Sequence, residues 1–338
     1  MGKKVTARDV AVLADVSLAT VDRVLNNRGG VTPNKERRVV LAARQMKLDR
    51  ALDFRAARTL RIAVLVQPPS NPFHAALAEA VKAESSGPNP FNVSLSLVHI
   101  DAGQPQRTAA AINGISDHTD ALMICAPQQA DIAAALSRFA GTGKPVVALA
   151  TELGVEVPHF YVGPDNRQAG RVAGDLMGRL VGREGGDILL LAGLFSMIGH
   201  GERREGFRAV LAERYPNCRI VAERETQERG DRAGTLAADA LARNANLRGI
   251  YNASNGAGAI VGVLRRSAKQ VTPVFITHEL TEDRRQFLRS GEIDAIIDQN
   301  PALEIRTAIA VLAAKFGRLD QEPATTVTPV QIYMTENC

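Results

Sequence analysis

The chain has 338 residues, of which 45% are hydrophobic and 23% charged, a composition typical of a folded globular protein with two or three domains. Its three cysteines, Cys125, Cys218 and Cys338, have no Cys-x-x-Cys spacing, so a disulfide framework and a zinc site are both disfavoured. No apolar run reaches the roughly 18 residues of a membrane span, and polar residues follow Gly2 where a signal peptide would be apolar. We therefore expect a cytoplasmic protein.

The charge of the chain is concentrated at one end. Residues 1–60 contain 13 Lys and Arg against 6 Asp and Glu, a net charge of +7. The remaining residues contain 28 against 30, a net charge of -2. A small basic unit on a nearly neutral body is the electrostatic signature of a protein that binds a polyanion.

Three short helices are predicted within the basic unit. Thr6 is placed to cap the first helix, and apolar residues at helical spacing follow it. The segment "ADVS" ends this helix, because Asp15 can adopt a left-handed turn and Ser17 can cap the next helix. A third helix begins in "VTPNKERR", where Thr32 precedes a proline at the first helical position. This pattern predicts a helix-turn-helix whose second helix enters the major groove of DNA.

The stretch "TARDVAVLADVSLATVDRVLNNRGGVTP" resembles the headpiece of the lactose-repressor (LacI/GalR) family of bacterial transcription regulators. The resemblance rests on the DVA, AxVS, TVxRVLN and VxP patterns, and it implies a DNA-binding headpiece over residues 1–47. It makes Leu18 and Ala19 the pair that reads bases, through thymine methyl groups or DNA shape. The residues expected at DNA are Thr6, Ser17, Leu18, Ala19, Thr20, Asp22, Arg23, Asn26, Arg28, Leu52 and Phe54.

Two charged residues in the second helix have alternative roles. Arg23 either reads guanine or anchors the helix on a phosphate, since half or more of such contacts go to the DNA backbone. Asp22 departs from the family pattern, in which a small hydroxyl usually stands. It either forms an ion pair with Arg28, Arg37 or Arg38, or accepts a hydrogen bond from a cytosine amino group.

Residues 48–60 are expected to form a hinge or linker. The segment "KLDRALDFRAARTLR" lacks the Pro and Asn of the family hinge and is a few residues shorter. Leu52 or Phe54 can act as a wedge in the minor groove, as apolar side chains do in other proteins that bend DNA. The alternative is an ordinary linker whose apolar residues pack on the headpiece.

Beyond residue 60, short apolar segments such as "RIAVLV", "ALMICA" and "DILLLA" alternate with helical stretches, which predicts parallel sheets covered by helices in two lobes. This body resembles the type I periplasmic-binding-protein fold over residues 61–333. We expect lobe 1 over about 61–164 and 300–327, and lobe 2 over about 165–299 and 328–338. The predicted fold class is a small all-α helix-turn-helix headpiece plus an α/β two-lobed, doubly wound parallel-sheet domain, with crossings between lobes near Gly163 to Asp165, Asn300 and Val327.

Ligands of such sheets bind at the carboxyl ends of the strands, here between the lobes. Phe73 can stack on an apolar sugar face while Asn71 binds a hydroxyl; alternatively, this turn only caps and packs the helix that follows. Arg203 matches the family's ligand-binding arginine, and Asp165 is expected mainly as a helix cap. The residues predicted to bind the effector are Asn71, Phe73, His74, Asp165, Arg203, Asn255, Glu279 and Gln299.

Several positions depart from the sugar-binding pattern. The Asp-Arg pair expected after "PVVAL" is Ala150-Thr151, the second aromatic clamp is His74, and a third aromatic position aligns near Gly230. The resemblance therefore implies a small polar ligand, which can be a sugar, a polyol or a sugar acid. No cofactor and no metal are expected.

Two other classes of protein share parts of this pattern. "GTGKP" lacks the first glycine of a phosphate loop and "NGAGAIVG" is an imperfect dinucleotide fingerprint, so an enzyme is disfavoured. A solute-binding protein of a transport system would share the body but not the basic headpiece. The sequence predicts a ligand-responsive transcription regulator. The family resemblance implies that it binds a near-palindromic double-stranded operator as a homodimer, with repression as the default, and that Ala76 and Ala80 lie at the dimer surface.

Overall fold

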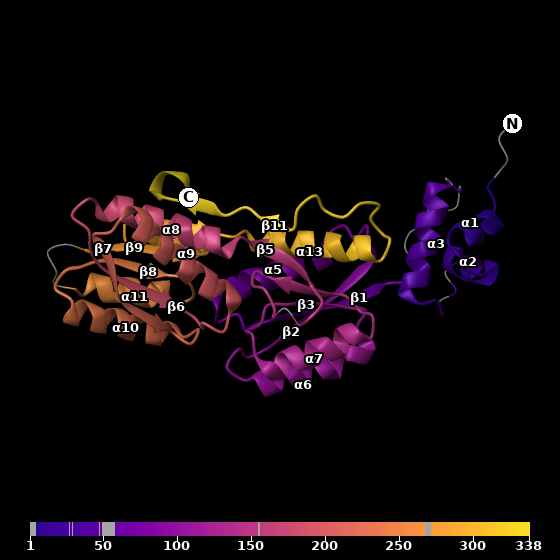
Figure 1. The fold of residues 1–338 in the computed structure, drawn as a ribbon, viewed down its shortest axis with the longest axis horizontal. Helices are drawn as coiled ribbons and strands as arrows, with labels where there is room; N and C mark the ends of the chain where they lie inside the picture. The colour runs from indigo at the N-terminus through magenta and orange to yellow at the C-terminus, as the bar shows by residue number, and fades with distance from the viewer. Residues whose placement is uncertain are drawn as a thin grey trace.

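The computed structural model describes residues 5–26, 28, 30–46, 48, 58–154, 156–267 and 272–338. The predicted wedge residues Leu52 and Phe54 lie outside this range. Within it, a small helical headpiece, lobe 1 and lobe 2 follow one another along the long axis of the molecule (Figure 1). None of the helices in these ranges is both long and apolar enough to cross a membrane.

The headpiece is the predicted helix-turn-helix, built from α1 (Ala7–Leu13), α2 (Leu18–Leu25) and α3 (Pro33–Gln45). Thr6 caps α1 in a capping box with Asp9, and the Ser17 hydroxyl accepts a hydrogen bond from the Thr20 amide at 3.2 Å to cap α2. Asp15 has a φ of 47°, the left-handed conformation that allows the tight turn between the helices. The small core of this unit consists of Val10, Ala11, Ala14, Val21, Val24, Val39, Val40, Ala42 and Ala43.

Lobe 1 is a six-stranded sheet in the order β11-β5-β4-β3-β1-β2, and its recorded pairings are parallel. Its strands are β1 (Leu60–Val66), β2 (Val93–His99), β3 (Ala121–Ile124), β4 (Val146–Leu149), β5 (Phe160–Pro164) and β11 (Val327–Thr328). Its helices are α5 (Pro72–Ser86), α6 (Pro105–Ile115), η1 (Ser116–His118), α7 (Ala130–Gly141) and α13 (Pro301–Lys315).

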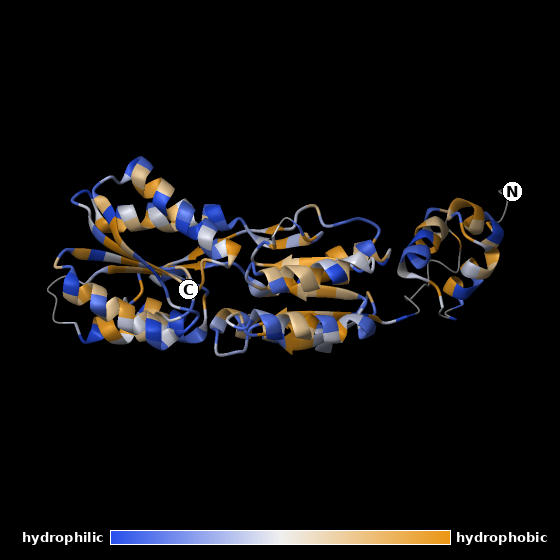
Figure 2. Ribbon diagram, turned by 60° about the horizontal axis from the view of Figure 1, so that its bottom comes forward, coloured by the Kyte–Doolittle hydropathy of each residue, from blue (hydrophilic) through white to orange (hydrophobic). Residues whose placement is uncertain are grey.

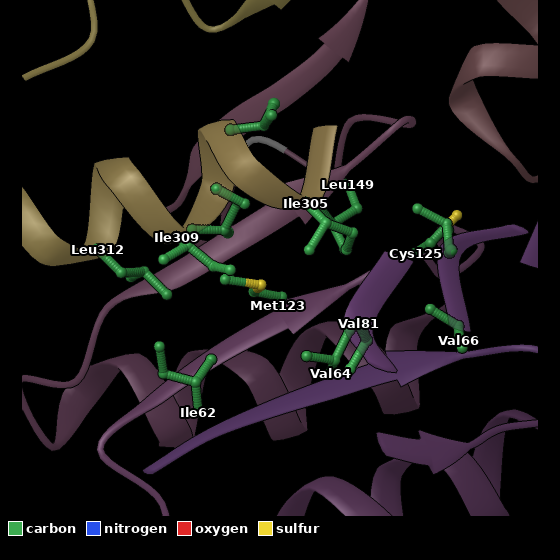
Figure 3. Close-up of a cluster of buried hydrophobic side chains, with 14 of the residues drawn as sticks. Ile62, Val64, Val66, Val81, Met123, Cys125, Leu149, Ile305, Ile309 and Leu312 are labelled. Atoms are coloured by element: carbon green, nitrogen blue, oxygen red, sulfur yellow. The ribbon is translucent and has the colours of Figure 1, made fainter. Parts of the chain in front are cut away.

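Alternation along β1 divides the core of lobe 1 between the two faces of the sheet. Ile62 and Val64 point toward α13, where they pack with Ile305 and Ile309 (Figure 3). Ala63 and Leu65 point to the opposite face, which α6 and α7 cover. Helix α13 is therefore embedded in the core along its length.

Lobe 2 is a second six-stranded sheet, in the order β12-β10-β9-β8-β6-β7, in which only β12 pairs antiparallel among the recorded pairings. Its strands are β6 (Gly186–Ala192), β7 (Cys218–Glu225), β8 (Leu247–Asn252), β9 (Val274–His278), β10 (Ala295–Asp298) and β12 (Gln331–Tyr333). Its helices are α8 (Asn166–Val181), α9 (Ile198–Arg214), α10 (Gly230–Arg243), α11 (Ala257–Arg265), α12 (Glu282–Arg289) and η2 (Thr335–Asn337).

The chain passes between the lobes after β5, after β10 and between β11 and β12. The apolar strands lie inside, and the covering helices turn their polar faces outward (Figure 2). Three strands were not predicted: β5, which contains Gly163 and Pro164, and the very short β11 and β12. Glycine and proline are poor strand formers, and two or three residues carry too little alternation to reveal a strand.

Candidate functional site

A cavity lies between the two lobes, which is a place where small-molecule ligands commonly bind. Residues that follow strands of both sheets line it, because the carboxyl ends of these strands face each other across the gap. Seven of the eight predicted effector-binding residues are on its walls: Asn71, Phe73, His74, Arg203, Asn255, Glu279 and Gln299. The cavity is also lined by Gln67, Cys125, Ala150, Thr151, Met197, Gly199, His200, Glu228 and Ser254.

Asp165 is the predicted effector residue that does not reach the cavity. Its side chain is exposed and accepts a hydrogen bond from the Gln168 amide at 2.8 Å, which caps α8. The adjacent Asn166 is buried instead and bonds to the Ala150 carbonyl at 2.8 Å, joining the lobes. Asp165 therefore acts as a helix cap, as the sequence mainly predicted, and it is not part of the cavity wall.

Arg203, on α9, is held by groups of the protein. Its Nε donates to Asn166 Oδ1 at 2.8 Å, and its two terminal nitrogens donate to the Ala253 carbonyl and to Gln299 Oε1, each at 3.0 Å. Its side chain is only 4% exposed. Arg203 thus fixes the floor of the cavity, where it positions Gln299.

Glu279 and Gln299 are polar residues of the cavity wall that bond to each other and to their neighbours. Arg284 donates to Glu279 Oε2 at 2.7 Å, and Gln299 Nε2 donates to the other carboxylate oxygen at 3.4 Å. Burial raises the pKa of Glu279, against the opposing effect of the Arg284 and Arg203 guanidinium groups. The charge of the Glu279 carboxylate is therefore compensated mainly by Arg284, which does not line the cavity.

Glu228 is a cavity residue that the sequence did not reveal. Its Oε2 accepts a hydrogen bond from Asn71 Nδ2 at 2.8 Å, which links lobe 2 to lobe 1. Its Oε1 is buried and has no hydrogen-bond partner among the described residues. Burial and the nearby Glu279 carboxylate raise the pKa of Glu228 to about 7. The site thus contains an acid whose second oxygen is ready to accept a hydrogen bond.

Two histidines, His74 and His200, line the cavity together with this acid. Burial lowers the pKa of His74 to about 3, and burial together with the Arg203 charge lowers the pKa of His200 to about 3 as well. Both rings are therefore neutral at neutral pH. Because His74 Nδ1 accepts from the Gln67 amide at 3.2 Å, its Nε2 carries the proton and is a donor. His200 Nδ1 lies 3.6 Å from Glu228 Oε1 but, being neutral, forms no ion pair with it.

Phe73 and Asn71 begin α5 at the lobe 1 wall. Asn71 Oδ1 caps the helix by accepting from the Phe73 amide at 3.1 Å, while its Nδ2 reaches Glu228. Phe73 is 7% exposed and belongs both to the lobe 1 core and to the cavity wall. The two roles considered for this turn are therefore compatible.

The loops around the cavity are backbone-strained. Ala150, Gln227, Glu228, Glu279 and Asn300 all have φ values between 56° and 60°, a region that costs non-glycine residues about 1 kcal/mol or more each. Each follows a strand at the cavity side of its sheet. Strain of this kind persists where the surrounding structure holds it, and here it aims side chains into the gap.

The recognition helix α2 presents the predicted reading face to the outside. Leu18 is 44% exposed, and Ala19 and Arg23 are exposed beside it, while Val21 and Val24 are buried against the other helices. Of the other predicted contacts in the headpiece, Ser17 and Thr6 serve as helix caps, and their hydroxyls lie on exposed surface. Leu18, Ala19 and Arg23 are therefore accessible on the outer side of α2.

Asp22 has partners within the headpiece. Arg28 donates to Asp22 Oδ2 at 3.0 Å, and Asn26 Nδ2 donates to the other oxygen at 2.6 Å. Arg38 is engaged elsewhere, with Asp15 at 2.7 Å. The structure therefore contains the ion pair with Arg28, one of the two roles considered for Asp22.

Ala80 is not available for a dimer surface. It is 7% exposed and packs into the lobe 1 core, because α13 covers this side of α5. The position of α13 is set by the second crossing and is not visible in the sequence of α5 itself. Only Ala76, of the two alanines, is partly exposed.

No group of three or more His, Cys, Asp or Glu side chains within the described ranges is arranged to hold a metal ion. Fold and site together define a two-lobed small-molecule binding protein joined to a helix-turn-helix headpiece.

Comparison with known families agrees with this definition. Residues 62–318 match the family model described as "Periplasmic binding protein domain", and residues 6–48 match "Bacterial regulatory proteins, lacI family". The chain therefore belongs to the periplasmic-binding-protein domain family through its body, and its headpiece is a helix-turn-helix DNA-binding domain of the lacI family. It is a transcriptional regulator and not an enzyme, as the sequence predicted. The comparison with curated proteins gives no match.

Solved structures share the fold of the body. GanP, a glucose-galactose binding protein from Geobacillus stearothermophilus, is 18% identical with a TM-score of 0.73, over 83% of this chain and 99% of that one. A Caulobacter myo-inositol binding protein is 19% identical with a TM-score of 0.71, over 82% and 94%. A solute-binding protein from Burkholderia graminis C4D1M in complex with D-arabinose is 21% identical with a TM-score of 0.72, over 84% and 98%.

Proposed function

We propose that the chain is a cytoplasmic repressor that binds a near-palindromic operator as a homodimer and changes its operator affinity when a neutral, polyhydroxylated ligand occupies the cavity between the lobes. The observation that carries the ligand class is the set of unpartnered polar atoms on the cavity wall. Among the described residues these are Gln67 Nε2, Ser254 Oγ and Glu228 Oε1. Gln67 Nε2 is a hydrogen-bond donor, Ser254 Oγ can donate or accept, and Glu228 Oε1 is an acceptor. Hydroxyl groups of a ligand can both donate and accept, so they complement all three atoms.

A sugar acid fits this wall poorly. Arg203 is the one Arg or Lys among the described residues that line the cavity, and its guanidinium nitrogens already donate to protein groups. Glu228 and Glu279 would repel an added carboxylate in a medium of low dielectric constant. Of the three ligand classes left open by the sequence, neutral sugars and polyols are therefore favoured. The structures of similar fold whose names include glucose, galactose, myo-inositol and D-arabinose are consistent with this class.

The cavity holds few aromatic groups. Phe73 is its one Phe, Tyr or Trp among the described residues, and His74 and Glu228 are also part of the wall. A pyranose held between two aromatic rings would need a second stacking partner. A polyol or cyclitol that exchanges hydrogen bonds with Glu228, His74 and Ser254 meets this wall better.

The ligand assignment is tested with matched pairs of neutral and acidic compounds. We expect glucitol, xylitol or myo-inositol to raise the thermal midpoint, because a ligand that binds only the folded protein stabilises it by mass action. Gluconate, xylonate and glucuronate serve as the acidic partners and should leave the midpoint unchanged. A shift produced by the acids alone would contradict the neutral class.

DNA binding is tested by selecting duplexes from a random pool at fixed ionic strength, since affinity depends strongly on salt. We expect enrichment of a near-palindrome and sedimentation of the protein as a dimer. Arg23→Ala should weaken binding, whereas Arg306→Ala, on the exposed side of α13, is the matched control. Absence of any preferred duplex would refute the regulatory function.

A further inference from the structure

The headpiece contacts lobe 1 directly at the end of α13. Glu36 of α3 lies 3.9 Å from the Arg318 guanidinium, and their side chains are 14% and 4% exposed. Beside this pair, a Cβ added at Gly317 would lie 2.9 Å from Arg37 Cγ, so α3 rests against the turn that follows α13. Figure 1 shows α3 on the side of the headpiece that faces lobe 1, with α1 and α2 beyond it.

Arg318 sits in a site formed by segments far apart in the sequence. Its guanidinium donates to the Phe91 carbonyl at 2.7 Å, to the Asn92 carbonyl at 2.9 Å and to the Arg58 carbonyl. Arg58, where the described chain resumes after the linker, also pairs with the buried Asp120. The end of the linker, the loop before β2, α13 and α3 therefore meet at one guanidinium.

The same helix reaches the ligand cavity at its other end. Asn300 caps α13 and follows Gln299, a cavity residue, and α13 then runs for 15 residues, about 22 Å. Ile305, Ile309 and Leu312 fix it in the lobe 1 core (Figure 3). A rigid rod thus joins the cavity wall to the headpiece contact.

The contact buries polar groups at some cost in free energy. The Nε atoms of Arg37 and Arg318 are buried without a hydrogen-bond partner among the described residues, which costs free energy. Burial raises the pKa of Glu36 and lowers that of Arg318 to about 10, so each charge loses hydration when the headpiece is in place. A buried ion pair contributes little net stability for this reason.

We propose that Arg318 and the turn around it form a docking socket for α3, which holds the headpiece on lobe 1 and sets its orientation toward DNA. The socket leaves the reading face free, since Leu18 on α2 is 44% exposed. The contact ties α3 directly to lobe 1, so movement of lobe 1 carries the headpiece with it. Its role at the operator rests on the proposed function, but the docking itself does not.

The docking is tested by NMR relaxation of headpiece amides in the full chain, without DNA or ligand. In the wild type, amides of α1 and α2 should tumble with those of the lobes. Glu36→Lys places a cation against Arg318, so the headpiece should acquire a shorter correlation time of its own. Glu36→Gln tests the same contact with less change, and Lys35→Gln, on the neighbouring exposed residue of α3, is the control. Preserved chemical shifts of α1 and α2 establish that the variant headpiece is folded.

The consequence for DNA is tested with duplexes that carry two half-sites at a series of spacings. A docked headpiece should favour one spacing, and Glu36→Lys should lose that preference while it still binds half-sites. Independent tumbling of the wild-type headpiece, or tumbling unchanged by Glu36→Lys, would overturn the socket. A spacing preference that survives release of the headpiece would overturn its role in orientation. If wild-type protein prefers no duplex, the regulatory function fails, and the relaxation data still decide the docking.

Discussion

Glu228→Gln is expected to change how the stability of the protein depends on pH. The pKa of Glu228 is about 7 in the folded chain, against an ordinary value of 4.5. Between these values the folded state binds a proton that the unfolded state has lost, so the free energy of unfolding falls as pH rises and reaches its full loss above about pH 7. The difference of these two pKa values corresponds to a loss on the order of 3 kcal/mol. Gln does not titrate, so the variant lacks this loss.

The measurement is urea unfolding followed by far-ultraviolet circular dichroism between about pH 5 and about pH 8. The variant should gain stability relative to the wild type across this range. His74 and His200, whose pKa values are lowered, contribute in the opposite direction but are present in both proteins and cancel in the comparison. Glu79→Gln, on the exposed side of α5, is the control and should run parallel to the wild type. Parallel curves for Glu228→Gln would refute the burial of an ionisable acid at this position.

Three further substitutions test other parts of the structure. In Gly193→Ala the new Cβ would lie 1.7 Å from Glu228 Oε1, so the carboxylate must move, and calorimetry should show weaker binding of whichever polyol stabilises the wild type. Arg203→Ala leaves three buried acceptors without their donor and should lower the free energy of unfolding by about 3 kcal/mol or more, measured in urea, whereas unchanged stability would contradict its structural role. Asp22→Ser should raise affinity for random duplex relative to the selected operator at fixed salt; an unchanged ratio of the two dissociation constants would remove Asp22 from recognition.

Much of the fold could be predicted because its signals are local. Thr6, Asp15 and Ser17 mark the ends of the headpiece helices through caps and a turn that involve only nearby residues. Nine apolar segments are strands in the structure, since each sheet is covered on both faces by helices. The residues predicted after strands come together at one cavity because parallel strands bring their carboxyl ends to one edge.

What could not be predicted depends on long-range packing. Glu228 reaches the cavity through two successive left-handed residues after β7, and no sequence pattern announces that conformation in Gln and Glu. His200 lies one turn before Arg203 on a helix whose orientation is set by lobe 2. Ala80 was assigned to the surface because α13, which buries it, comes more than two hundred residues later in the chain.

The left-handed residues at the rim of the cavity affect how a ligand would be received. Their conformation is already fixed by the sheets, so an incoming molecule need not order these loops and forfeits little conformational entropy in doing so. Selectivity would then depend on how well the hydroxyl groups of the ligand match the fixed positions of the polar side chains. The slow step in binding would be the separation of the two lobes that lets the ligand enter.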